Sequence, residues 1–200
     1  MDATLEFQPL TADRWDDLAA LFGRSGACYG CWCMFWRLSS TEFNATKAGQ
    51  HEEALRALVA AGSVPGILAY VDGQPAGWCS IAPRHTYARL VLSRSLQPVD
   101  EQPVWSIVCF FIGRQYRGQG IAAGLLRAAV TYAGRQGAPA VEAYPPDTGH
   151  EIIPDTSAYM GTLDMFLEAG FHLVRRVEGK GNARPRCIVR SDLGVRQAAG

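Results

Sequence analysis

The chain has 200 residues, in which 19 lysines and arginines balance 19 aspartates and glutamates. This length suffices for one domain with its own hydrophobic core, and we predict a single domain over residues 1–200 with a core at about 5–193. The zero net charge excludes the broad basic surface of nucleic-acid and anionic-membrane binders, so any anionic ligand has to be bound by local groups.

Membrane and export signals are the next feature to consider. The longest apolar stretches, such as 104–112, fall far short of the ~20 residues of a membrane span. The opening MDATLEFQPL has neither the basic nor the apolar region of a secretion signal. We therefore expect a cytoplasmic protein with no membrane partner, in which the six cysteines are reduced thiols.

Hydrophobic periodicity predicts alternating strands and helices along the chain. The predicted strands are 5–9, 67–71, 74–82, 105–112, 141–144, 172–177 and 186–192, and 83–103 is predicted to be irregular, with a short strand at 87–93 as the alternative. The predicted helices are 11–22, 53–61, 118–136 and 159–169. Asp72-Gly73 favours a tight hairpin, whereas 147–157 is predicted to be a polar loop and the GKGN sequence at 179–182 a turn.

The run 105–112 is apolar, β-branched and aromatic throughout, which is typical of a strand buried on both faces. The helix 118–136 follows, with Gly137 placed as its C-terminal cap, and then the strand 141–144. A strand–helix–strand unit of this kind crosses over right-handedly and makes its two strands parallel. Together with the antiparallel hairpin before it, the unit predicts a mixed sheet in an α/β (mixed α+β) fold.

A glycine-rich turn, Q-Y-R-G-Q-G at 115–120, joins the buried strand to this helix. Glycine lets a phosphate approach backbone N–H groups without interference from a Cβ, and the first amides of a helix add donors and a positive dipole. The same glycines could instead serve only the geometry of the turn. Ala123 replaces the third glycine of the dinucleotide fingerprint, and the antiparallel strands before the turn do not suit a dinucleotide-binding sheet.

In this context the turn resembles the signature Q/R-x-x-G-x-G/A of the GNAT superfamily of N-acetyltransferases, which Gln115, Gly118 and Gly120 meet. The helix continues as I-A-A-G-L-L, as the family's helix does, and F-L-E-A-G-F at 166–171 is similar to the Y-x-x-x-G-F pattern of its closing helix. The resemblance covers 5–192 and implies a GNAT-like fold, with a central splayed mixed β-sheet flanked by about four helices.

The resemblance also implies a transferase that uses acetyl-CoA as acyl-donor co-substrate. In similar enzymes the pantetheine arm bonds to the end of the buried strand and the pyrophosphate lies on the amides of the turn. The matching residues here are Phe110, Phe111, Ile112, Arg117, Gly118, Gln119, Gly120, Ile121 and Ala122. The implied reaction is N-acetylation of a small-molecule or peptide amine by direct attack on the thioester.

The catalytic residues depart from the family pattern. The tyrosine that serves as general acid in many members is replaced by Phe166, so Tyr159 on the same predicted helix face is the substitute candidate. Glu142 is the first candidate for the base, because alternation puts it with Tyr144 on one face of the strand that walls the splay. His85 is the second. For Tyr159 and Glu142 a purely structural role is the alternative.

An aromatic and cysteine-rich segment, ACYGCWCMFWR at 27–37, connects the first two predicted helices. In similar acetyltransferases this connection lines the acceptor pocket, and aromatic rings offer apolar walls and cation–π faces to an amine. The substrate-binding candidates are therefore Trp32, Trp36, Trp78 and Tyr144. Packing in the core is the alternative for each ring.

The three clustered cysteines, Cys28, Cys31 and Cys33, are one ligand short of a zinc site, and no metal site is assigned. Two other functions stay open beside N-acetyl transfer: a non-catalytic acyl-CoA-binding sensor, which the missing tyrosine favours, and a thiol-rich metal or redox module on the same scaffold. The acceptor is not encoded in any motif, and a homodimer is compatible with the sequence.

Overall fold

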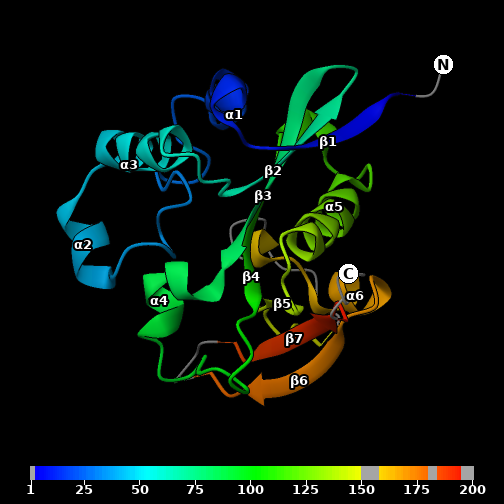
Figure 1. Cartoon of the computed structure of the whole chain (residues 1–200). Helices are drawn as coiled ribbons and strands as arrows, with labels where there is room; N and C mark the ends of the chain where they lie inside the picture. Colours follow the sequence, from blue (N-terminus) through cyan, green and yellow to red (C-terminus); the bar gives the residue numbers. More distant parts are fainter. Residues whose placement is uncertain (1–2, 150–157, 180–183, 195–200) are drawn as a thin grey trace, which may run out of the picture.

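The computed structural model describes residues 3–149, 158–179 and 184–194, and within them a seven-stranded mixed sheet has the order β1-β2-β3-β4-β5-β7-β6 (Figure 1). The strands are β1 Leu5–Pro9, β2 Gly66–Val71, β3 Gln74–Pro83, β4 Trp105–Ile112, β5 Ala140–Ala143, β6 His172–Val177 and β7 Arg186–Asp192. The helices are α1 Trp15–Phe22, α2 Ser40–Ala45, α3 Ala48–Ala60, α4 Ala88–Val91, α5 Ile121–Arg135 and α6 Leu163–Glu168, with short 3-10 turns η1 Ala12–Arg14, η2 Arg84–Thr86, η3 Arg114–Tyr116 and η4 Ala158–Met160.

The helices cover both faces of the sheet, as Figure 1 shows for α5 on one side and α1 and α3 on the other. On the first face Leu125 and Ala129 of α5 pack in one hydrophobic cluster with Ile107 and Phe110 of β4. On the opposite face Phe22 of α1 belongs to a second cluster with α3 and β3. The predicted mixed sheet flanked by helices is confirmed, and α2 and α4 add two short helices to the four expected.

The parallel strands β4 and β5 separate soon after they pair. Their register covers Trp105–Ile107 of β4 only, whereas β4 continues along β3 as far as Ile112. Beyond Ala143 the chain stays beside β7 instead, and the Cys187 N–H donates to the Pro145 carbonyl at 2.9 Å. The predicted splay therefore opens at Ile107.

A β-bulge lies in β4 at the same point. Ser80 of β3 pairs with Cys109 and Ile81 pairs with Ile107, so Val108 is the additional residue. Val108 and Cys109 consequently both pack away from α5, in a third cluster on the opposite face. The bulge interrupts the alternation of the strand where the splay opens.

Two local predictions from the sequence are wrong. The segment 87–93, predicted to be irregular or a short strand, contains α4, because Tyr87 and Leu90, three residues apart, are buried together in one cluster. The helix predicted at 159–169 is divided into η4 and α6, because Gly161 between them has a φ of 79°. Most of the predicted polar loop and of the GKGN turn lies outside the described residues.

No helix of the described part of the chain is both long and apolar enough to cross a membrane.

Candidate active site

The glycine turn lies between β4 and α5, directly beyond the splay. Gly118 and Gly120 have φ values of 75° and 74°, a left-handed conformation that is costly for other residues, and Gly120 is the N-cap of α5. A Cβ placed on either glycine would meet no atom within 4 Å. The space on the Cβ side of both glycines is therefore open, so that a ligand can approach the backbone of the turn closely.

Hydrogen-bond donors lie beside this open turn. The N–H of Gly124 donates to the Gly120 carbonyl at 3.1 Å, which is the first hydrogen bond of the helix. The amides of Ile121 and Ala122 precede it and therefore have no acceptor within the helix. Arg117 Nε donates to the Ile112 carbonyl at 3.3 Å, which holds this guanidinium beside the end of β4. A helix N-terminus and an arginine on an open turn fit a diphosphate.

The end of β4 supplies the second part of the predicted cofactor site. Phe110 and Ile112 face α5, whereas Phe111 faces α1 and its ring lies 5.5 Å from that of Phe22. Pairing with β5 has ended before this part of β4, so the edge that points away from β3 has no strand of the described residues beside it. Its backbone groups are placed to bind an extended ligand as a neighbouring strand would. All nine predicted cofactor residues thus lie along one path from β4 to α5.

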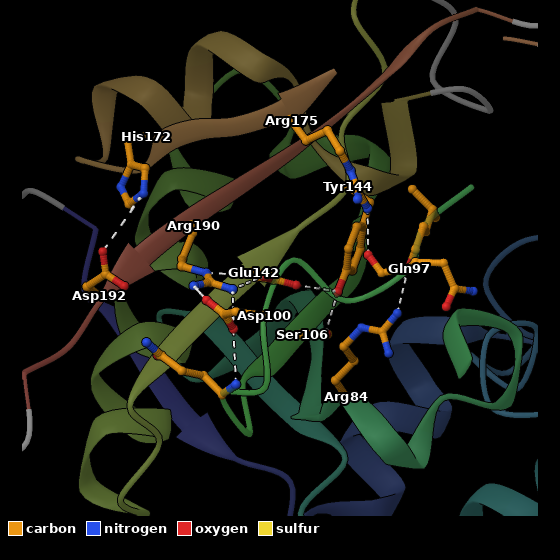
Figure 2. A network of polar contacts seen from close by, with 12 residues as sticks. Arg84, Gln97, Asp100, Ser106, Glu142, Tyr144, His172, Arg175, Arg190 and Asp192 are labelled. Carbon is orange, nitrogen blue, oxygen red and sulfur yellow. Dashed lines mark hydrogen bonds and ion pairs between the residues drawn. The ribbon is translucent and has the colours of Figure 1, made fainter. Parts of the chain in front are cut away.

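Glu142 lies at the centre of a buried polar network on the other face of β5 (Figure 2). Its side chain is 2% exposed, and Oε1 accepts from Arg190 Nη2 at 2.7 Å and from Arg190 Nε at 3.2 Å. Oε2 accepts from the Tyr144 hydroxyl at 3.1 Å, and that hydroxyl lies 2.8 Å from Ser106 Oγ. Glu142 and Tyr144 share a face as predicted, but the ion pair with Arg190 favours the structural alternative for Glu142.

Asp100 completes the network by pairing with Arg190, whose Nη2 donates to its Oδ1 at 3.1 Å. The hydrogen bond from Arg190 lowers the pKa of Asp100. The stabilisation from this contact is therefore full above the unfolded pKa, about 3.9, and is lost as the pH falls through the lower folded value. Burial, followed by the charge of Glu142, raises the pKa of Tyr144 and keeps its hydroxyl a donor.

A cavity of about 510 Å³ lies beside this network, and both base candidates, Glu142 and His85, line it. Three hydrogen bonds occupy three of the roughly four acceptor positions of the Glu142 carboxylate. One position is left for a water molecule in the cavity. The base role predicted for Glu142 therefore stays a prediction that requires such a water.

The four predicted acceptor-binding rings separate into two groups. Trp78 is fully buried and its Nε1 donates to Cys33 Sγ at 3.2 Å, and Trp32 is stacked on Trp15 at 6.0 Å in the same cluster. Tyr144 is also fully buried. These three rings lie in the core and present little or no surface to a substrate, whereas Trp36 lines a cavity.

Of the three clustered thiols, Cys33 is buried in the same core, whereas Cys28 and Cys31 are partly exposed. Hydrogen bonding to neighbouring thiols together with burial raises the pKa values of Cys31 and Cys33, so both are neutral near pH 7. Among residues that the structure describes, no group of three or more histidines, cysteines, aspartates or glutamates is placed to hold a metal ion.

The cavity beside Trp36 has a volume of about 310 Å³ and adjoins the bulge of β4. Its lining residues are Phe35, Trp36, Ser40, Arg89, Leu92, Ser93, Tyr159 and Arg186. Trp36 and Tyr159 belong to one cluster with Val108 and Cys109, and Tyr159 is close enough to Cys109 for that thiol to affect its pKa, so this part of the lining is near the bulge. Burial raises the pKa of Tyr159, opposed by the neighbouring Arg186. Sequence reasoning did not identify Arg89 and Arg186 as site residues, because neither belongs to a motif.

The comparisons with known proteins agree with this geometry. The sequence model of the acetyltransferase (GNAT) family matches residues 32–150. The chain belongs to the GNAT family. No curated protein matches the sequence.

Three solved structures illustrate the similarity of this GNAT protein to others. The protein yncA of Salmonella typhimurium, solved with acetyl-CoA, has a TM-score of 0.56 at 11% identity, over 98% of this chain and 96% of its own. An N-acetyltransferase from Staphylococcus aureus Mu50 has a TM-score of 0.56 at 10% identity, over 96% of this chain and 99% of its own. Ribosomal-protein-alanine N-acetyltransferase from Brucella melitensis has a TM-score of 0.55 at 13% identity, over 94% of this chain and 99% of its own. At these identities the likeness is one of fold.

The first prediction concerns the glycine turn of this GNAT protein. Gly120→Leu should abolish CoA binding in calorimetry, because a side chain would occupy the open surface above the amides. Gly137→Leu is the matched control, since Gly137 has a φ of 80°, open space for a Cβ and a position just beyond the other end of α5. Both variants should lose about 1–2 kcal/mol of stability. Unchanged CoA affinity in folded Gly120→Leu would show that the turn does not hold the diphosphate.

The second prediction concerns Glu142 and Arg190. Each of Glu142→Gln and Arg190→Gln should destabilise the fold, and the double variant should cost less than the sum by about 0.5–3 kcal/mol, because the two side chains form one buried pair. Urea unfolding of the three variants measures this coupling. If the stability losses of the two single variants simply add up in the double variant, the two side chains do not form a coupled pair. A loss of turnover in Glu142→Gln that Arg190→Gln does not share would instead identify Glu142 as the base.

Proposed function

We propose that this GNAT protein is an N-acetyltransferase that moves an acetyl group from acetyl-CoA to the amine of a small molecule or peptide by direct attack on the thioester. The observation that supports the proposal is the edge of β4 from Val108 to Phe111, which has no strand partner on the side of β5 within the described residues and leads into the open glycine turn. A similar fold that holds acetyl-CoA, and others named as N-acetyltransferases, support it.

The donor side uses backbone groups of this chain. Acetyl-CoA supplies an activated acetyl thioester. The amides at the start of α5 bind its diphosphate, and the edge of β4 binds its extended arm and directs it along the strand toward the bulge at Val108. Holding the donor in one orientation converts the encounter with the amine into an effectively intramolecular reaction.

The acid assigned to the reaction is Tyr159. Phe166, which occupies the family's tyrosine position, is fully buried between the rings of Phe110 and Phe171, so this position provides no proton donor. Tyr159 lines the smaller cavity beside the bulge, and burial raises the pKa of its hydroxyl. A tyrosine that stays protonated at neutral pH can donate to the departing thiolate.

The buried Phe166 also favours a second candidate function, a non-catalytic acyl-CoA-binding sensor. The two functions differ in turnover. We expect purified protein to release CoA only when an amine is present, with the acetylated amine as the other product. Because Cys28, Cys31 and Cys109 are partly exposed and would react with thiol reagents, CoA is quantified by chromatography. Tight CoA binding without turnover of any amine class would support the sensor.

The third prediction tests the acid. Tyr159→Phe should lower kcat and kcat/KM by roughly ten-fold to several thousand-fold and leave CoA affinity nearly unchanged, because the hydroxyl is lost while the ring still fills its place. Tyr132→Phe, a half-buried tyrosine on α5 that packs edge-on against Trp105, is the matched control and should keep full turnover. A full-rate Tyr159→Phe enzyme would exclude Tyr159 as an essential acid.

A further inference from the structure

The smaller cavity, next to the splay, is cationic as well as aromatic. It receives Arg89 from α4 and Arg186 from β7, with Phe35 and Trp36 as its aromatic wall. None of the described residues that line it is an aspartate or a glutamate. Two guanidinium groups in a concave wall without a carboxylate make a local positive site on a chain whose net charge is zero.

Arg89 is held in place by aromatic rings. Its Cζ lies 3.9 Å from the centre of the Phe35 ring and 5.4 Å from that of Phe43, and its backbone N–H donates to the Trp36 carbonyl at 3.1 Å. Its Nε is buried and has no hydrogen-bond partner within the described ranges. Desolvation lowers the pKa of Arg89, and the nearby Tyr159 opposes this shift.

Arg186 is the second guanidinium that lines the cavity. Its Cζ lies 5.9 Å from the centre of the Trp36 ring, and Nη1 donates to Met160 Sδ, a weak acceptor. Trp36 itself is 8% exposed. Burial raises the pKa of the neighbouring Tyr159, whereas the charge of Arg186 and hydrogen bonding to Arg186 and Trp36 oppose that rise.

We propose that this cavity binds the acceptor and that the acceptor is a small amine that also carries a carboxylate, of the amino-acid class. The inference rests on the proposed function and specifies its substrate. A carboxylate accepts two parallel N–H bonds from a guanidinium, and the cavity is lined by two guanidinium groups, those of Arg89 and Arg186. With the carboxylate on Arg89 and Arg186, the amine is left to face Tyr159 and the bulge of β4.

The size and lining of the cavity define the rest of the acceptor. A volume of about 310 Å³ is at the lower end of the roughly 300–1,000 Å³ of small-molecule sites, which suits a single amino acid. Phe35 and Trp36 provide an apolar surface for its side chain. The amino end of an ordinary peptide carries no carboxylate beside its amine, so a free amino acid fits this cavity better.

The experiment compares matched acceptors that differ only in the carboxylate. Phenylalanine and leucine are paired with phenethylamine and 3-methylbutylamine, CoA release is measured by chromatography, and calorimetry in the presence of CoA measures binding without turnover. We expect each amino acid to have at least a ten-fold higher kcat/KM than its amine partner. Arg186→Gln and Arg89→Gln should each reduce this preference by about ten-fold, mainly through KM.

The control variants separate charge from folding. Arg127→Gln, on an exposed position of α5, should leave both kcat/KM values unchanged. Arg89→Lys keeps the charge over Phe35 but loses the bidentate fork, so it should lie between wild type and Arg89→Gln with an unaltered melting temperature.

The outcomes distinguish this inference from the proposed function. Turnover of the amines at rates equal to or above those of the amino acids, unaffected by the arginine variants, would overturn the acceptor class and leave N-acetyl transfer intact. Arginine-dependent binding of phenylalanine in calorimetry without turnover of any acceptor would support the carboxylate site and overturn the enzyme. If the protein neither binds amino acids nor acetylates them, the inference is overturned.

Discussion

The structure depends on a gap in its own sheet: pairing between the parallel strands β4 and β5 stops at Ile107. A gap leaves backbone groups without sheet partners, so it persists only where other contacts hold the two sides apart. On one side β4 stays bonded to β3 through the bulge at Val108. On the other, Glu142 of β5 pairs with Arg190 of β7, which ties β5 to β7 where it leaves β4. The proposed donor site and the proposed acceptor cavity both lie near this opening.

The parts of the fold that could be predicted from the sequence are those with local causes. The strand 105–112 and the hairpin before it follow from β-branched and aromatic runs around Asp72-Gly73, and the turn at Gly118 and Gly120 follows from the need for a positive φ. Helix α2 was missed although Ser39 and Glu42 form a capping box that the sequence already displays.

The candidate site was predictable only in its donor half, for a physical reason. The cofactor path is continuous in sequence, whereas the acceptor cavity combines Phe35, Arg89, Tyr159 and Arg186, which only the tertiary fold brings together. The segment that contains Trp32 and Trp36 has no helical or strand period, and the positive φ of 44° at Trp32 changes the direction of the chain between the two rings. One ring therefore enters the core and the other lines the cavity, which spacing alone does not reveal.

Zero net charge and a cationic cavity are compatible because recognition is local. Asp100 and Glu142 are committed to Arg190, so their charges do not offset Arg89 and Arg186. Two guanidinium groups near an acceptor amine also destabilise its protonated form and lower the pKa of the ammonium, because like charges repel more strongly where water is excluded. The arginines that would bind the carboxylate would thus help to produce the neutral amine that attacks the thioester. A strong side-chain base is then not required, which is consistent with the ion pair that holds Glu142.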